Sequence, residues 1–273
     1  MKRDGHIHTP FCPHGSKESL TAYVEKAIRL GLERITFTEH APLPTSFTDP
    51  TPLKDSAMTV ADVPLYIKEV TALKDYYANK ITIQCGFEVD YIEGLEEETK
   101  DFLNEYGMQI DDCILSVHFL KDKNQWFCLD YHEDTFHVMI QSFGSVERIY
   151  DTYYQSILAS IHADLGSFKP KRLGHITLVH KFQELFPVSK EYKTKEKEWW
   201  GTILQETQKY NYQLDCNGAG IVKPYCKEVY PPISVIQQAL SMQIPCVYGS
   251  DAHHPNGLAQ GVTNELRELI RHF

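Results

Sequence analysis

The sequence has no closely spaced cysteine pair and no long apolar segment. Its seven cysteines lie at positions 12, 85, 113, 128, 216, 226 and 246, and none of them forms a Cys-x-x-Cys pair. No apolar run reaches the roughly 18 residues that a transmembrane helix needs, and no secretory apolar stretch follows Met1-Lys2-Arg3. We therefore predict free thiols, a cytoplasmic location and no membrane partner.

The sequence also lacks basic tracts, internal repeats and low-complexity segments. It has 27 Lys and Arg against 37 Asp and Glu, a formal net charge of −10. Proteins that follow a phosphate backbone usually carry clustered Lys and Arg, so nucleic acid is not an expected partner. A length of 273 residues, with 42% hydrophobic and 23% charged residues, predicts one globular domain over residues 1–273. The oligomeric state is not indicated.

Two hydrophobic periods alternate along the chain, one typical of strands and the other of helices. The strand pattern occurs at residues 2–6, 34–38, 81–87, 113–117, 173–176, 213–216 and 245–248. The helical pattern occurs at residues 17–30, 61–77, 95–106, 134–164, 194–210, 232–241 and 263–271. Ser16 is the expected N-cap of the first helix, and Gly31 its expected C-terminal cap.

Seven successive strand-then-helix units predict an α/β protein with a parallel sheet. Closure of that sheet leaves no edge strand, so we expect a TIM-like (β/α)7 barrel, with an open doubly wound sheet as the alternative. The one long irregular stretch, residues 41–62, contains Pro42, Pro44, Pro50 and Pro52. Such a loop is either a lid over a functional site or a structural insertion.

The strongest local motif is Asp4-Gly5-His6-Ile7-His8 at the start of the chain. Side chains alternate between the two faces of an extended segment, so His6 and His8 lie on one face. His14 follows a turn that can return a third imidazole to the same place. Paired imidazoles on one face are typical of a metal site, whereas solvated histidines of an N-terminal arm are the alternative.

Further potential ligands come at the carboxyl ends of the other predicted strands. They are His40, Glu88, His118, His175, Asp251 and His253. In a barrel these ends surround one mouth, so residues from the whole chain converge. Seven histidines and two carboxylates exceed the needs of one ion, which indicates two or three metals, with Glu88 as a bridge.

Such a cluster suits the hydrolysis of phosphate esters, because neighbouring metal ions activate water and hold both the attacking and the leaving oxygen. Glu88, Asp251 and His253 are the predicted catalytic residues. A phosphate also needs cationic donors, and Arg172 and Lys223 are the candidates near the mouth, with solvated surface charges as the alternative.

Together these motifs resemble the polymerase-and-histidinol-phosphatase (PHP) superfamily, in particular its histidinol-phosphatase branch. The matching segments are Asp4 to His8, His14, Thr38 to Leu43, Gly86 to Glu88, Ser116 to Phe119, Gly174-His175 and Gly249 to His253. The resemblance implies a distorted seven-stranded barrel and three divalent ions, of zinc, iron or manganese. It assigns three ligand sets, which are His6, His8, Glu88 and Asp251, then Glu88, His118 and His175, and finally His14, His40 and His253.

The activity implied by the resemblance is that of a metal-dependent phosphoric monoester hydrolase in histidine biosynthesis. Its small-molecule substrate would be L-histidinol phosphate, which is hydrolysed to L-histidinol and phosphate. Two alternatives remain open at this point. One is a PHP-type phosphoesterase that acts on another monoester or on nucleic acid 3′ ends, and the other is a non-catalytic metal-binding barrel.

Overall fold

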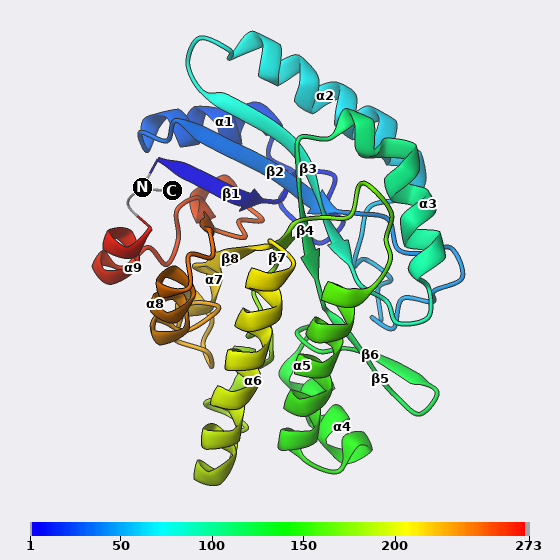
Figure 1. Ribbon diagram of the computed structural model, residues 1–273. Helices are drawn as coiled ribbons and strands as arrows, with labels where there is room; N and C mark the ends of the chain where they lie inside the picture. The colour runs from blue at the N-terminus through cyan, green and yellow to red at the C-terminus, as the bar shows by residue number, and fades with distance from the viewer. Residues whose placement is uncertain (1, 271–273) are drawn as a thin grey trace.

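Seven parallel strands form a nearly closed barrel in the computed structural model, which describes residues 2–270 (Figure 1). Their order around the barrel is β1-β2-β3-β4-β7-β8-β9. The bounds are β1 Arg3–Ile7, β2 Arg34–His40, β3 Thr82–Asp90, β4 Asp112–Ser116, β7 Arg172–Leu173, β8 Gln213–Asn217 and β9 Cys246–Gly249. The predicted barrel is therefore confirmed, and the open sheet is not the fold.

The first and last strands meet through a short parallel contact that brings the two chain ends together. Ile7 pairs with Ala252, the amide of His8 donates to the carbonyl of Ala252 (3.0 Å), and the amide of Asp251 donates to the carbonyl of His6 (2.8 Å). These bonds lie just beyond the end of β9, so closure occurs at the same level as the predicted ligands.

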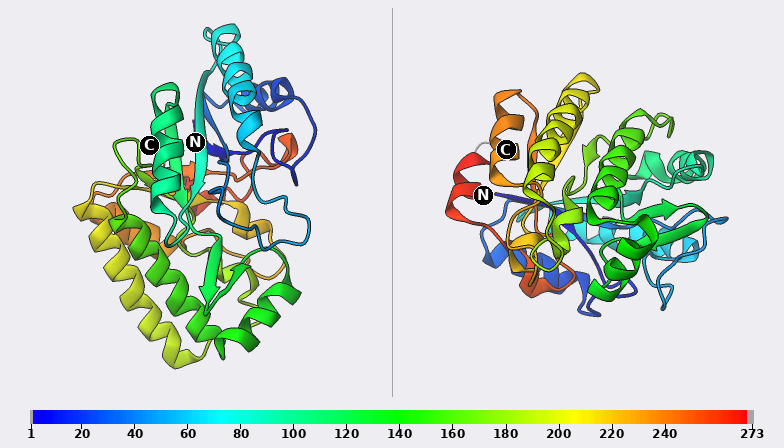
Figure 2. Two further views of the ribbon diagram at one scale, coloured as in Figure 1. Left: turned by 90° about the vertical axis from the view of Figure 1, so that its right-hand side faces the viewer. Right: turned by 90° about the horizontal axis from the view of Figure 1, so that it is seen from below.

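Helices surround the barrel (Figures 1 and 2), and residues of both strands and helices form one hydrophobic core. The α-helices are α1 Leu20–Arg29, α2 Val63–Tyr76, α3 Glu96–Tyr106, α4 Glu133–Phe143, α5 Val146–His162, α6 Lys190–Lys209, α7 Ala219–Val222, α8 Ile233–Ser241 and α9 Asn264–Leu269. Short 3₁₀ helices are η1 Val60–Asp62, η2 Gly107–Gln109, η3 Leu178–Phe182 and η4 Pro255–Gly257. Among residues 2–270, no helix combines the length and the apolar character needed to cross a membrane.

The segment from 119 to 162 differs most from the prediction. The expected single helix over 134–164 is two helices, because Gly144 takes a left-handed conformation (φ 89°) and Ser145 caps the next helix by accepting from the amide of Arg148. Before them, β5 Phe119–Asp122 and β6 Gln125–Cys128 form an antiparallel hairpin that was not predicted.

Some helix ends were also predicted wrongly. Helix α1 begins one turn later than expected, and its N-cap is Ser19 rather than Ser16, with the Ser19 hydroxyl accepting from the amide of Ala22. The predicted helix 263–271 is α9, and residue 271 lies outside the described residues.

Candidate metal centre

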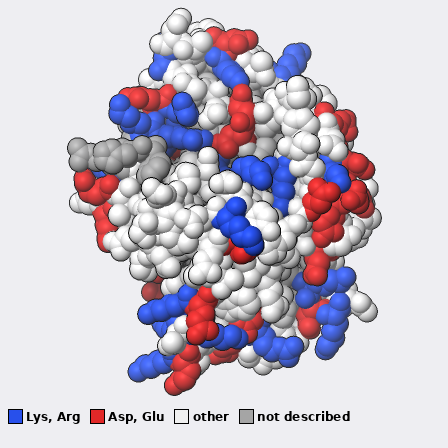
Figure 3. Space-filling view, in the orientation of Figure 1, with Lys and Arg blue, Asp and Glu red and all other residues white. Residues whose placement is uncertain are grey.

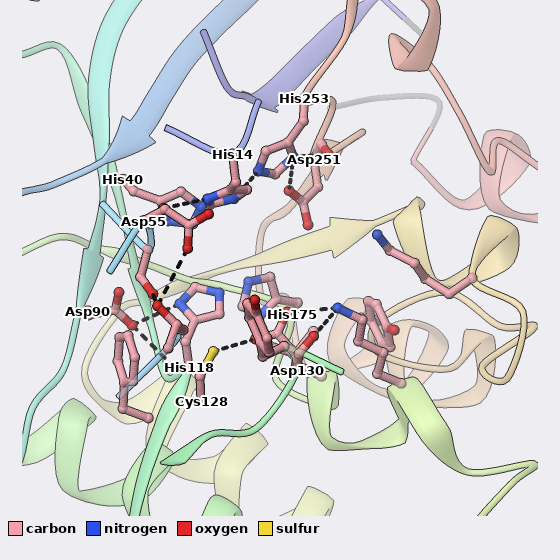
Figure 4. A pocket seen from close by; sticks show the side chains of 18 of the residues that line it. His14, His40, Asp55, Asp90, His118, Cys128, Asp130, His175, Asp251 and His253 are labelled. Carbon is pink, nitrogen blue, oxygen red and sulfur yellow. Dashed lines mark hydrogen bonds and ion pairs between the residues drawn. The ribbon is translucent and has the colours of Figure 1, made fainter. Parts of the chain in front are cut away.

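The predicted ligands converge on one cavity at the carboxyl end of the barrel. This cavity has a volume of about 530 Å³. Figure 4 shows His14, His40, His118, His175, Asp251 and His253 around it, from segments spread over the whole chain. His6, His8 and Glu88 lie directly beneath and are buried. The structure thus brings together all nine residues that were predicted as ligands, eight from strand ends and His14 from a turn.

Glu88 lies at the centre of the cluster, and its two oxygens face different groups of imidazoles. Oε2 lies 3.2 Å from Nε2 of His6, 3.4 Å from Nε2 of His8 and 3.3 Å from Nδ1 of His40. The other oxygen, Oε1, lies 2.9 Å from Nε2 of His175 and 3.6 Å from Nε2 of His118. A carboxylate in this position can bridge two cations.

The remaining predicted ligands surround the same point from the β9 side. Asp251 Oδ1 lies 3.2 Å from Nε2 of His8, whose ring stacks on that of His253 with centroids 3.9 Å apart. Nε2 of His14 lies 3.1 Å from Nε2 of His253. His14, from the loop after β1, therefore approaches the cluster as the motif predicted.

Most of these imidazoles are oriented by an acceptor on the nitrogen that points away from the cluster. His6 Nδ1 lies 2.8 Å from Asp215, His118 Nδ1 2.8 Å from Asp90, and His8 Nδ1 3.2 Å from Glu39. These three carboxylates were not predicted, although Glu39 adjoins a ligand and Asp90 alternates with Glu88 along β3. They fix which nitrogen carries the proton, as acceptors behind metal-bound histidines do.

The cluster fits divalent cations because several buried nitrogens otherwise have no hydrogen-bond partner. Nε2 of His6, Nε2 of His8 and Nδ1 of His40 have none, yet all three face Glu88 Oε2. Burial lowers the pKa of His6 and of His8, but nearby carboxylates bring it to about 10 for His6 and well above the usual value for His8, so without a cation the near nitrogens would carry protons toward Glu88. A divalent cation between these nitrogens and the carboxylate would take the place of those protons.

The electrostatic environment shifts the pKa values of the cluster residues in different directions. Burial raises the pKa of Glu88, but the surrounding imidazoles, His6 first, bring it well below the usual range. Burial lowers the pKa of His40 and of His253 well below 6.5. Glu88 is therefore ionised and these two imidazoles are neutral, whereas the carboxylates beside His6, His8 and His118 hold the pKa of those imidazoles above the usual range despite their burial. A cation that binds them would have to displace protons.

Backbone geometry at the end of β9 makes room for the cluster. A Cβ on Gly249 would lie 2.3 Å from Asp215 Oδ1 and 2.5 Å from the Cβ of His6, so only glycine leaves space for their contact. Asp251 adopts a left-handed conformation (φ 53°), which aspartate tolerates better than most residues. This turn directs the carboxylate of Asp251 toward His8.

The two predicted phosphate-binding residues lie in different places. Lys223 lines the cavity, and burial together with nearby Lys181 lowers its pKa. Arg172 begins the two-residue strand β7 and is buried among Gly5 and Asp112 at the amino end of the barrel, with its Nη2 2.8 Å from Asp112 Oδ2. The placement of Arg172 near the mouth was therefore wrong, and its position does not fit a substrate-binding role.

Two further contacts near the cluster were not indicated by the sequence pattern. Asp4, the first residue of the N-terminal motif, accepts from the backbone amides of Ser250 (2.9 Å) and Ala259 (3.2 Å) and joins β1 to the segment after β9. The ion pair between Lys181 and Asp130 (3.1 Å) lines the cavity but was not predicted, because neither residue ends a strand of the barrel.

Comparison with known proteins agrees with this site. The family model of the PHP domain matches residues 4–219. The chain is 50% identical to the histidinol-phosphatase of Bacillus subtilis over 256 residues, which cover 93% of this chain and 94% of that protein. These two findings place the chain in the PHP domain family. Within this family it belongs with the histidinol-phosphatases.

Solved structures show the same fold. A Listeria monocytogenes protein assigned as a histidinol phosphatase superposes with a TM-score of 0.92 at 40% identity, covering 95% of this chain and 98% of that one. The Lactococcus lactis histidinol phosphate phosphatase, in complex with zinc, L-histidinol and phosphate, superposes with a TM-score of 0.72 at 20% identity. That match covers 99% of this chain and 92% of the other.

Proposed function

We propose that this protein hydrolyses L-histidinol phosphate to L-histidinol and inorganic phosphate, as a step of histidine biosynthesis. The main support for this proposal is the position of Glu88, whose two oxygens face separate groups of imidazoles at the base of an open cavity. Its support from relatives is the 50% identity to the histidinol-phosphatase of B. subtilis.

Three ions would be held by the ligand sets that share this cavity. His6, His8, Glu88 and Asp251 would hold the first, Glu88, His118 and His175 the second, and His14, His40 and His253 the third. Bound divalent ions supply activation of water and neutralisation of phosphoryl charge. Imidazole and carboxylate ligands accept zinc, iron or manganese. The zinc in the L. lactis relative favours zinc.

Residues around the cluster would bind the phosphate group and set the protonation of the imidazole ligands. We assign phosphate binding to Lys223, because it lines the cavity and no hydrogen bond or salt bridge occupies its ammonium among the described residues. Glu39, Asp90 and Asp215 hold the imidazole protons away from the cluster. Glu88, Asp251 and His253 are the proposed catalytic residues at its centre.

The reaction needs water as its only second substrate. The water oxygen forms a bond to phosphorus as the bond from phosphorus to the histidinol oxygen breaks, and a proton passes to the departing oxygen. On the face shown in Figure 3, basic side chains are interspersed with acidic ones and form no continuous basic track. The net charge of −10 likewise favours a small ester over a long polyanion.

The proposal is tested by phosphate release from the purified protein with added divalent ions. Histidinol phosphate, p-nitrophenyl phosphate and a short single-stranded oligonucleotide are compared at one metal concentration. We expect the highest kcat/KM for histidinol phosphate and three ions per chain by elemental analysis. Preference for the oligonucleotide would support the nuclease alternative, and absence of turnover with all three ions bound would support the non-catalytic one.

A further inference from the structure

The charged groups that line the cavity divide into those with partners and those without. Of its four aspartates, Asp90 is engaged by His118 (2.8 Å), Asp130 by Lys181 (3.1 Å) and Asp251 by His8 (3.2 Å). Asp55 forms no salt bridge among the described residues. Its carboxylate makes one long contact, 3.5 Å from the hydroxyl of Thr51. An uncompensated carboxylate therefore lies in the wall of the cavity.

Asp55 is held in place by its own loop. Asp49 accepts from the amide and hydroxyl of Thr51 and from the amide and hydroxyl of Ser56, at 2.8–3.1 Å, which fixes the turn on both sides of Asp55. At the base of the loop, the ring of Phe47 packs on Phe119 of the β5–β6 hairpin with centroids 5.0 Å apart. The carboxylate is thus presented by an ordered segment.

The same residue also contacts the cluster through its backbone. The carbonyl of Asp55 accepts from Nδ1 of His14 (2.7 Å), and Figure 4 shows Asp55 on the same side of the cavity as His14 and His40. The carboxylate therefore lies beside the proposed reaction centre, while the backbone carbonyl orients a ligand. The two roles of the residue can be separated by changing the side chain alone.

We propose that Asp55 is the specificity-determining residue that accepts a hydrogen bond from the substrate's ammonium group; this inference rests on the proposed function. The cavity then offers unpaired charges of both signs, with Lys223 for the phosphate and Asp55 for the amine. Of the two basic groups of histidinol, the aliphatic amine is the one that stays charged at neutral pH. A hydrogen bond from this ammonium to the Asp55 carboxylate is charge-assisted and is therefore stronger than a bond between neutral groups.

The test uses three phosphate esters in the metal-loaded enzyme. They are histidinol phosphate, alaninol phosphate, which keeps the amine but lacks the imidazole, and 3-(imidazol-4-yl)propyl phosphate, which keeps the imidazole but lacks the amine. Asp55→Asn should lower kcat/KM about 10- to 100-fold for the two amines, the range expected for a hydrogen bond to a charged group. The ester without an amine should be unaffected, and Asp55→Glu should recover part of the loss.

Asp62→Asn is the matched control, because it removes one negative charge from the end of the same loop without reaching the cavity. It should leave all three esters unchanged. An equal loss for all three esters in Asp55→Asn would overturn the proposal, since the residue would then act through His14, and so would unchanged kinetics. If the wild type does not prefer histidinol phosphate to p-nitrophenyl phosphate, the proposed function fails instead, whatever the variant does.

Discussion

The carboxylate of Asp215 lies 2.8 Å from Nδ1 of His6, and both side chains are completely buried. Because this contact holds the proton on Nδ1, it leaves Nε2 free to face Glu88. Asp215→Asn should lower the affinity for metal about 10- to 100-fold, as is usual for loss of an acceptor behind a ligating histidine. Metal titration measures this affinity, and Asp75→Asn, at an exposed position on α2, is the control.

Glu88→Gln tests the bridging role. The amide keeps the size of the side chain but removes the charge and one acceptor oxygen, so the two groups of imidazoles lose their common ligand. We expect kcat to fall by about three orders of magnitude or more, while the circular dichroism spectrum stays that of the wild type. Near-normal turnover with the full metal content would show that the cluster is not the catalytic centre.

His253 and His254 provide a matched pair at the end of β9. His253 reaches His14 in the cluster, whereas Nδ1 of His254 accepts from the amide of Asn256 (3.0 Å) at the start of η4. His253→Asn should lower the metal content by about one ion per chain and reduce turnover. His254→Asn should retain the ion, since asparagine is also a good N-cap. The reverse result would move the third ligand set by one residue.

Lys223→Gln tests phosphate binding. Removal of the ammonium should raise KM for histidinol phosphate and weaken inhibition by inorganic phosphate, each by about tenfold or more. Lys227→Gln, an exposed position in the same loop, is the control. If inhibition by phosphate is the same in both variants, Lys223 does not bind the phosphate.

The buried imidazole of His180 should make stability depend on pH. Burial lowers its pKa, but bonds to Glu196 (2.7 Å) and Glu228 (2.6 Å) raise it to about 9. Because the folded-state pKa exceeds the unfolded value of about 6.5, the stabilisation is complete below pH 6.5 and is lost as pH rises toward 9.

The free energies of unfolding of wild type and His180→Gln, measured with urea, should therefore converge as pH rises. The difference should shrink by about 3 kcal/mol between pH 6.5 and pH 9. A difference that stays constant over this range would show that His180 is not protonated in the folded protein.

The sequence allowed the barrel strands and the inner ligands to be predicted because both follow simple local rules. A strand of alternating or apolar residues ends where polar residues begin, and in a parallel barrel all such ends meet. Gly144-Ser145 carried a usable signal as well, since glycine after a helix and serine before the next are common caps. This signal was missed because the hydrophobic pattern of a helix continues on both sides of Gly144-Ser145.

Other features depend on packing that no local pattern encodes. Arg172 was placed at the mouth because it comes just before the ligand segment Gly174-His175, but Arg172 begins the two-residue strand β7, so its side chain lies at the amino end of the barrel. Asp215 precedes the end of β8 by two residues, and only the space over Gly249 brings it to His6. Asp55 lies within a loop whose path is fixed by Asp49, Phe47 and the unpredicted hairpin.

The contact between β1 and the end of β9 indicates that the first ion would also stabilise the closed barrel. His6 and His8 stand on one side of this seam and Asp251 on the other, and two backbone hydrogen bonds join the sides here. An ion bound by all three residues would link the first and last strands. It would stabilise the closed barrel, because a ligand that binds only the folded state stabilises that state. Removal of the ion with a chelator should therefore destabilise the contact between β1 and the segment after β9. In hydrogen exchange, the amides of His8 and Asp251 should then exchange before those of β2 and β3. During synthesis, the chain could not complete this metal site until residue 251 had been added.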